Sequence, residues 1–199
     1  MTPPSIKVAT SSDEASVIDA IVLAFSTDPL ARWIWPDPHE YLTHFPDLTR
    51  GYGEKAFVHE SAYYIDGYLG GALWLPPDVH PDEDPVIALL QNTVTADKQE
   101  DLLGLFERMD SYAPEEPHWY LPFIGVDSMH QGKGLGSALM EHALQRCDRD
   151  NTPAFLESSN PRNISLYERH GFEVLDTFQV GPSPPVSTML REPPFALKS

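Results

Sequence analysis

The chain has 199 residues, 41% of them hydrophobic, which is enough for one domain that buries roughly 70% of its unfolded surface. Its 30 acidic residues outnumber 13 basic ones, and the resulting net charge of −17 argues against nucleic-acid binding, which needs a basic face. A single cysteine, Cys147, excludes an intramolecular disulfide framework and a cysteine zinc cluster.

Targeting and membrane signals are missing from the sequence. No apolar run reaches the roughly 20 residues that a membrane-spanning helix needs. Residues 1–5 lack the basic and apolar regions of a signal peptide. We therefore expect a cytoplasmic protein with no membrane partner.

The N-terminal third predicts a short strand at residues 6–9 and then a helix. Ser11 or Ser12 would cap this helix, and the Asp28-Pro29 pair would end it. Aromatic residues follow, which either line an acceptor pocket or pack helices onto the sheet; they are Trp33, Trp35, Tyr41 and Phe45.

The middle of the chain predicts a hairpin and then a helical insertion. Residues 57–65 and 67–75 form the two strands, and Gly70-Gly71 indicates a bulge or a close backbone approach. Two helical segments at 86–92 and 102–109 lie within an insertion spanning about 82–115.

A strand, a glycine loop and a helix follow one another between His118 and Cys147. The strand contains Pro122, which cannot donate to a ladder and so predicts a bulge or a gap in pairing. The loop, Gln131-Gly132-Lys133-Gly134-Leu135-Gly136, bares backbone N–H groups at a helix start, which suits a phosphate. It lacks the Gly-Lys-Ser/Thr of a Walker loop and the G-x-G-x-x-G of a dinucleotide fold.

A second block lies downstream, with a strand at 155–158, then Asn160-Pro161-Arg162-Asn163, then a helix from Ile164 that leads into Gly171-Phe172. Together with the Gln-x-x-Gly-x-Gly of the loop, this strand-Asn-helix-Tyr-x-x-x-Gly-Phe order resembles the GNAT family of N-acetyltransferases. Residues 173–180 and 186–190 would add a closing hairpin.

The resemblance implies an α+β fold of three layers over one domain, residues 1–199. Its sheet would be mixed, mostly antiparallel, of about six or seven strands, splayed at the centre and covered by helices on both faces. It also implies acetyl-CoA as cosubstrate and no metal. The cofactor-binding residues would be Ile124, Gly125, Val126, Gln131, Gly132, Lys133, Gly134, Leu135, Gly136, Asn163 and Tyr167.

Coenzyme A is anionic, so an acidic protein must hold it through local fields. Besides the helix start, the candidates for this role are Lys133, His130 and Arg162, each of which could instead be a solvated surface residue.

Acetyl transfer to an amine needs a base and a proton donor. Glu157, at the end of its strand, is the candidate base, with a structural ion pair as the alternative; His118 and Tyr120 could replace it or hold a water. The resemblance implies that Tyr167 is the general acid at the cofactor sulfur, and the alternative is an aromatic packed under the helix. Cys147, on the buried stripe of its helix, would be a poor nucleophile, so transfer would be direct.

The expected function is therefore an acetyl-CoA-dependent N-acetyltransferase acting on a primary amine of a small molecule, peptide or protein. A CoA-binding sensor with weak catalysis is the alternative, and transfer to a hydroxyl or of a longer acyl chain is a third reading. The sequence leaves the acceptor open, and the protein could be a monomer or a homodimer.

Overall fold

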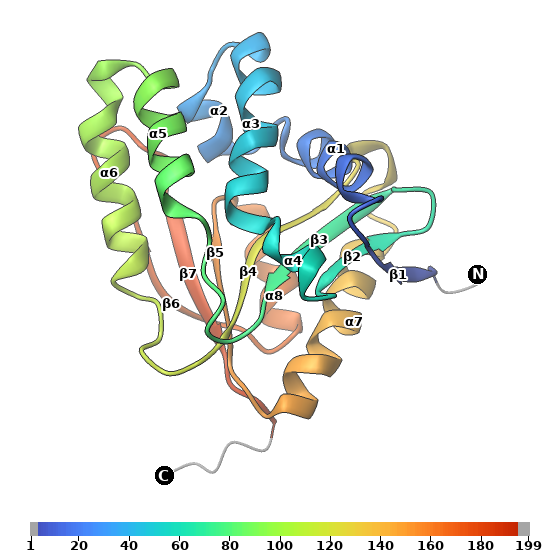
Figure 1. The fold of residues 1–199 in the computed structure, drawn as a ribbon. Coiled ribbons are helices and arrows are strands. Elements are labelled where there is room, and N and C mark those ends of the chain that lie inside the picture. The colour runs from blue at the N-terminus through green and yellow to red at the C-terminus, as the bar shows by residue number, and fades with distance from the viewer. Residues whose placement is uncertain (1–3, 195–199) are drawn as a thin grey trace.

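The computed structural model describes residues 4–194, and its centre is one seven-stranded sheet (Figure 1). The strand order is β1-β2-β3-β4-β5-β7-β6, and every neighbouring pair is antiparallel except β4–β5. The strands are β1 (Ile6–Val8), β2 (Ala62–Ile65), β3 (Gly70–Leu75), β4 (Trp119–Val126), β5 (Ala154–Ser158), β6 (Glu173–Phe178) and β7 (Val186–Arg191).

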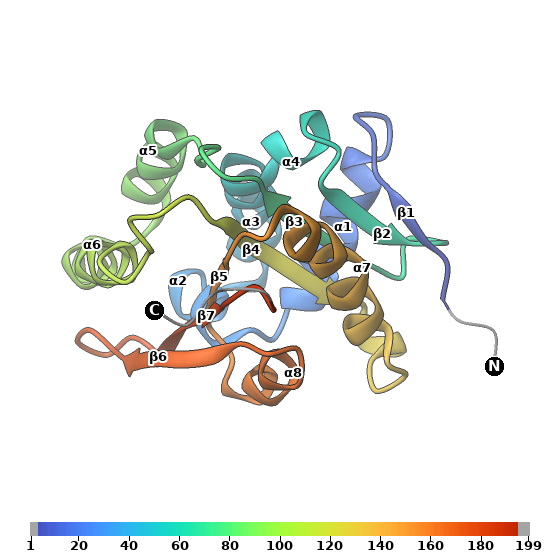
Figure 2. The same ribbon diagram turned by 90° about the horizontal axis from the view of Figure 1, so that it is seen from below.

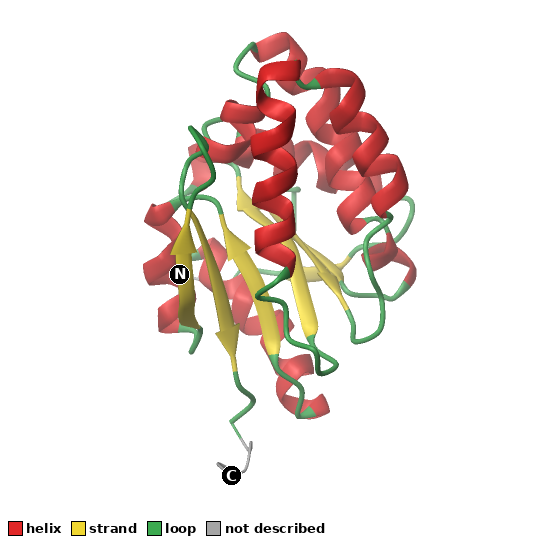
Figure 3. Ribbon diagram, turned by 90° about the vertical axis from the view of Figure 1, so that its left-hand side faces the viewer, coloured by secondary structure: helices red, strands yellow, loops and turns green. Residues whose placement is uncertain are grey.

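Helices connect the strands and cover both faces of the sheet (Figure 3). They are α1 (Glu14–Phe25), α2 (Pro29–Ile34), α3 (Pro38–Gly53), α4 (Lys55–Val58), α5 (Glu83–Thr93), α6 (Ala96–Asp110), α7 (Leu135–Asp150) and α8 (Ile164–Arg169), with short 3-10 turns at Ser128–His130 and Pro161–Asn163. Among residues 4–194 no helix has the length and hydropathy that would suit it to a bilayer.

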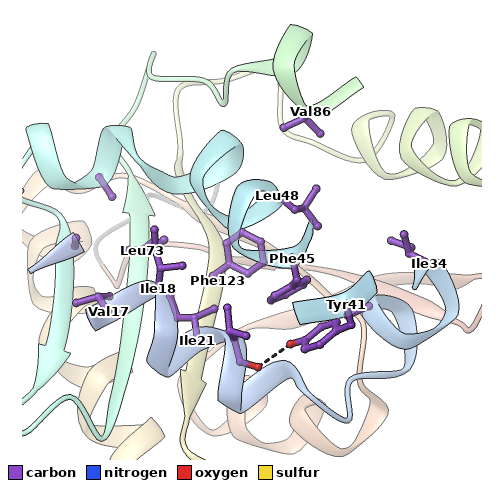
Figure 4. Close-up of a cluster of buried hydrophobic side chains, with 14 of the residues drawn as sticks. Val17, Ile18, Ile21, Ile34, Tyr41, Phe45, Leu48, Leu73, Val86 and Phe123 are labelled. Carbon is purple, nitrogen blue, oxygen red and sulfur yellow. Dashed lines mark hydrogen bonds between the residues drawn. The ribbon is translucent and has the colours of Figure 1, made fainter. Parts of the chain in front are cut away.

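Two hydrophobic cores lie on opposite faces of the sheet, because successive strand residues point to opposite sides. In β3, Leu73 packs with α1 to α5, whereas Ala72 and Trp74 pack with α7 and α8. The first core contains Phe45 of α3 and Phe123 of β4, whose ring centroids are 5.9 Å apart (Figure 4).

Strand β4 carries a bulge at Pro122, as the sequence predicts. Phe123 pairs with Leu73, but Tyr120 pairs with Leu75, so three steps along β4 match two along β3. The extra residue shifts the alternation of side chains between the two faces of the sheet. Leu121 and Ile124 are three positions apart and would face opposite sides in a regular strand, but both face the second core.

The sheet is nearly divided between β4 and β5. These parallel strands pair only at Trp119–Ala154 and Tyr120–Phe155. Beyond Tyr120 the rest of β4 pairs only with β3, and the rest of β5 pairs only with β7. The bulge therefore marks the point where the two halves of the sheet separate.

The insertion is a pair of helices, α5 and α6, at the side of the molecule away from α7 (Figure 2). On α5, Val86 and Leu90 are buried in the first core, against α3. On α6, Leu105 packs on Phe178 of β6 and Val186 of β7. The pair thus extends from α3 to the far edge of the sheet.

Several predicted boundaries need correction. Phe57 belongs to α4, not to a strand, because it packs into the first core from a helical turn; β2 begins only at Ala62. Asp13, not Ser11 or Ser12, occupies the N-cap of α1.

The glycine pair of β3 makes a close backbone approach without a bulge. A Cβ atom at Gly70 would lie 2.6 Å from the carbonyl oxygen of Gly125. The pair itself is in regular register with β4, and the register shift falls between Leu73 and Leu75.

Candidate active site

A cavity of about 100 Å³ occupies the gap between β4 and β5. Its walls come from α2, α3, α6, the two strands and α8, and most of them are apolar. Glu157 of β5 and Tyr167 of α8 both line it. The gap in the sheet thus brings the two predicted catalytic residues to one cavity.

Glu157 lies at the boundary between this cavity and a second, larger one. Both cavities are also lined by Tyr52, Phe106 and Tyr120. Burial raises the pKa of Glu157 to about 7, although a hydrogen bond from the Tyr120 phenol opposes the rise; the negative charge of Asp110 adds to it. A carboxyl with this pKa can accept and release a proton near neutral pH.

The predicted alternative for Glu157, a structural ion pair, is wrong for the described residues. Among residues 4–194 no lysine, arginine or histidine lies within 4 Å of its carboxylate. Its partner is instead the neutral Tyr120, which stacks on Phe155 with ring centroids 6.3 Å apart.

Tyr167 is buried, with 6% of its surface exposed, and its ring contacts Phe172 edge-on at 6.2 Å. Burial raises its pKa above the ordinary value for a phenol, and the negative charge of Asp28 adds to the rise. The phenol therefore stays protonated at physiological pH. The packed-aromatic reading and the proton-donor reading are both compatible with this position, because the side chain is in the second core and also lines the cavity.

Asp28 is a cavity residue that the sequence did not identify. It was predicted to end the first helix, but α1 ends at Phe25 and Asp28 caps α2, accepting hydrogen bonds from the N–H groups of Leu30 (3.0 Å) and Ala31 (3.1 Å). Its other oxygen accepts a 2.7 Å bond from the Ser159 hydroxyl. The contact joins the α1–α2 connection to the end of β5, across the mouth of the gap.

The glycine loop adopts the backbone that its composition predicts. Gly132 and Gly134 have φ of +73° and +79°, and no atom lies within 4 Å of where a Cβ would stand at either residue. Gly134 is the N-cap of α7, so the first N–H groups of this 16-residue helix follow directly. The loop is open to solvent on this side and can accept a phosphate group.

The side chain of Gln131 has a local role that the pattern alone did not indicate. Its Nε2 donates a 3.0 Å bond to the carbonyl oxygen of Val126, the last residue of β4. The bond fixes the distance between the strand end and the glycine loop. Leu135 and Gly136, the first residues of α7, follow half-buried, and a Cβ at Gly136 would make ordinary contacts with Leu166 at 3.5 Å and Val126 at 3.9 Å.

The β4 segment Ile124-Gly125-Val126 faces the gap on its unpaired edge. Only glycine fits at position 125, because a Cβ there would lie 2.5 Å from the Cβ of Ala24 in α1. The helix thereby packs tightly on the strand beside the cavity.

The predicted charged and polar helpers have different surroundings. His130 pairs with Asp127 at 3.1 Å, and Lys133 Nζ lies 3.4 Å from the carbonyl oxygen of Met129. Asn163 begins α8 without capping it through its side chain, and it lines the cavity in the gap. Arg162 is exposed at the same helix start.

The remaining predicted residues divide between pocket and core. His118 lines the larger cavity, and Phe45 lines the one in the gap. Trp35 and Tyr41 are core residues, each 1% exposed. Tyr41 donates a 2.7 Å hydrogen bond to the carbonyl oxygen of Val22 (Figure 4), and Trp33 is partly buried beside the same core.

Comparison with known protein families identifies the family of the chain. A model described as the acetyltransferase (GNAT) family matches residues 24–172, well over half of the chain. The chain belongs to the GNAT acetyltransferase family. Both sequence predictions, the family and its splayed, mostly antiparallel sheet with helices on both faces, are thereby confirmed.

Individual relatives within and around the GNAT family agree with this assignment. An uncharacterized N-acetyltransferase of Schizosaccharomyces pombe is 35% identical over 82 residues, a segment that covers 40% of this chain and 33% of that protein. The chain thus spans about a third of that relative's length.

Solved structures resemble almost the whole chain. A Corynebacterium glutamicum protein described as histone acetyltransferase HPA2 and related acetyltransferase is 27% identical, with a TM-score of 0.68 and 96% of each chain covered. The polyamine N-acetyltransferase of Drosophila melanogaster is 14% identical, with a TM-score of 0.66, 95% of this chain covered and 99% of the other. At that identity the second structure shows the fold alone.

Proposed function

We propose that the protein transfers an acetyl group from acetyl-CoA directly to a primary amine. The observation that carries this proposal is the cavity in the gap between β4 and β5, which Glu157 and Tyr167 both line. Family membership supplies the reaction class. The residues are assigned their roles by their surroundings.

Glu157 acts as the general base. An alkylammonium with a pKa near 10.4 must lose a proton before its nitrogen can attack, which costs about 4 to 5 kcal/mol at pH 7. Burial holds the pKa of Glu157 at about 7, far closer to that of the amine than an ordinary carboxyl would be. Tyr120 keeps the carboxylate oriented through their shared hydrogen bond. The proton taken from the ammonium leaves to water through the larger cavity.

Tyr167 stabilises the departing sulfur. As the amine nitrogen bonds to the carbonyl carbon, the carbon–sulfur bond breaks and the nitrogen releases its second proton. The Tyr167 phenol, which burial keeps neutral, donates a hydrogen bond to the departing thiolate. The proton that the nitrogen has released then protonates the thiolate. A thiolate with a reference pKa near 8.5 is already a fair leaving group, so this contribution is at the low end of about 10² to 10⁴-fold.

The glycine loop and the start of α7 hold the diphosphate of acetyl-CoA. The open space around Gly132 and Gly134 lets phosphate oxygens approach the bare N–H groups. The unpaired edge of β4 at Ile124 to Val126 offers backbone groups to the extended pantetheine arm, as a neighbouring strand would. Lys133 and Arg162, both exposed, add positive charge near the phosphates.

Direct transfer is favoured because the chain's thiol cannot carry the acetyl group. Cys147 is 1% exposed on the core side of α7, and burial raises its pKa to about 12. Its thiolate is therefore scarce near neutral pH, and its position is remote from solvent.

Two measurements together test the function. Calorimetry with acetyl-CoA and with CoA should give saturable binding, and release of free thiol should follow when primary amines are added. Binding of both ligands with no thiol release for any monoamine, diamine, amino acid or peptide would support the CoA-binding sensor instead. No heat with either ligand would refute the proposal.

A further inference from the structure

The larger cavity has a volume of about 540 Å³ and opens from Glu157 outward between β4, α3, α5 and α6. This volume greatly exceeds that of the cavity in the gap. Since the two share Glu157 and Tyr120, an amine nitrogen that reaches Glu157 can extend its remaining atoms only into the larger cavity or back into the gap. The larger cavity is therefore the place where the rest of the acceptor molecule would bind.

One part of the lining of this cavity is apolar. It is formed by Val86 and Leu90 of α5 and by Leu102 and Phe106 of α6. A short aliphatic chain would be covered on both sides by these residues. The contacts suit methylene groups that follow the reacting nitrogen.

Another part of the lining is strongly acidic. It is formed by Asp78, Glu83, Glu107, Asp110, Glu115 and Glu116. The described chain, residues 4–194, gives no ion pair within 4 Å to any of these carboxylates, and the only cationic candidates lining the cavity are His80 and His118. The excess of negative charge in this cavity has no internal counterion there.

Two of these carboxylates stand at the ends of the two helices of the insertion. Glu83 stands in the first turn of α5 and Asp110 is the last residue of α6. They are close enough that the charge of Glu83 raises the pKa of Asp110, after burial, and the charge of Asp110 in turn raises that of Glu157. The three carboxylates thus line one cavity and influence one another through their charges.

We propose that this cavity binds the second cationic group of an aliphatic diamine or polyamine acceptor, with Glu83 and Asp110 as its partners. The inference rests on the proposed acetyl transfer and names its acceptor class. The reacting nitrogen lies at Glu157, the methylene chain packs between α5 and α6, and the distal ammonium replaces the missing counterion. A monoamine of equal length would leave the carboxylates unpaired and place a methyl group beside them.

The test compares 1,4-diaminobutane with n-butylamine, which have the same carbon chain. Wild-type enzyme should favour the diamine at least about tenfold in kcat/KM, the value of one charge-assisted hydrogen bond. The variants Glu83→Gln and Asp110→Asn should each reduce this ratio about tenfold, mainly through KM. Glu83→Gln should leave n-butylamine nearly unchanged, whereas Asp110→Asn also acts on Glu157 and should alter the rates of both amines, with the larger loss for the diamine.

The matched control is Asp84→Asn. Asp84 follows Glu83 on α5 and does not line the cavity, so its replacement changes the net charge equally. It should leave the ratio unchanged. A ratio near one for the wild type, or equal losses in the Asp84 and Glu83 variants, would overturn the subsite.

Failure of catalysis itself is separated by a binding measurement. If neither amine is acetylated, the proposed function fails, and titration of the CoA-bound protein with 1,4-diaminobutane then decides the subsite. Saturable binding that weakens in Asp110→Asn but not in Asp84→Asn supports it. Absence of such binding refutes it.

Discussion

Replacement of Glu157 by glutamine keeps the size of the side chain and removes its charge. The variant therefore separates the two consequences of burying this carboxylate beside the cavity: catalytic use of a group that titrates near neutrality, and a loss of stability whenever the group is ionised. We expect Glu157→Gln to lower activity and to raise stability above neutral pH.

The size of the expected stability change follows from the pKa of Glu157. Burial raises it from 4.5 to about 7. At 1.36 kcal/mol for each pKa unit, the ionised carboxylate costs the folded state up to about 3 kcal/mol. Because the pKa is raised on folding, the folded state binds the proton more tightly. The associated stability is complete below pH 4.5 and is lost as the pH rises to about 7.

Thermal unfolding at two pH values measures this cost. For a chain of this length, about 1 kcal/mol moves the Tm by about 2 to 4 °C, so Glu157→Gln should gain up to about 6 to 12 °C over wild type at pH 8 and almost nothing at pH 4.5. Glu173→Gln, on the exposed surface of β6, is the control and should show no such difference. An equal Tm shift at both pH values would show that burial of Glu157 does not raise its pKa.

Kinetic measurements on the same variant test the catalytic role of Glu157 independently of the unfolding measurements. In wild type, kcat/KM should rise with pH and level off above about 7, where Glu157 is ionised. The variant should lose about 10² to 10⁴-fold and also lose this limb of the profile. A variant that keeps the wild-type rate and profile would remove Glu157 from the mechanism.

Three further substitutions test the rest of the site. Tyr167→Phe should lower kcat about 10²-fold while calorimetry finds CoA affinity unchanged; a normal rate would leave Tyr167 as a packing residue only. Gly134→Ala should weaken CoA binding and cost about 1 to 2 kcal/mol in urea unfolding, because its φ is +79°, whereas Gly136→Ala, inside α7, should not lower stability; equal losses of stability would contradict this. Asp28→Ala should cost about 2 kcal/mol in the same assay through the lost α2 cap and its bond to Ser159, and an unfolding midpoint equal to wild type would contradict that.

The family resemblance implied the sheet and its division, and the irregularity in β4 and the glycine loop could be predicted from local chemistry. Pro122 interrupts one strand and has no donor for a ladder, so the irregularity had to fall there. The glycine loop was equally recognisable, since Gly132 and Gly134 need a backbone that other residues avoid. Features of this kind depend on residues that are consecutive in the sequence.

Other features depended on contacts that no local pattern contains. The sequence predicts only a helix end at Asp28. Its bond to Ser159 could not be predicted, because the two residues are 131 positions apart in the chain. Phe57 was assigned to a strand because aromatic residues favour strands, and burial in the first core prevailed over that preference. The pKa of Glu157 arises from burial and from Asp110 on the inserted helix, so the sequence could propose the residue but not its titration.

The near-division of the sheet also bears on how the chain folds. Strands β1 to β4 are neighbours in sequence order, and β5, β6 and β7 are consecutive in the chain although β7 lies between the other two, so each half of the sheet is built from its own continuous part of the chain. During synthesis the N-terminal half would emerge and fold first, and helix α7 alone would connect it to the later half. Docking of the two halves, through the two β4–β5 pairs, the packing of α6 on β6 and β7 and the bond between Asp28 and Ser159, would then be the last step, and the same step creates the cavity that Glu157 and Tyr167 line.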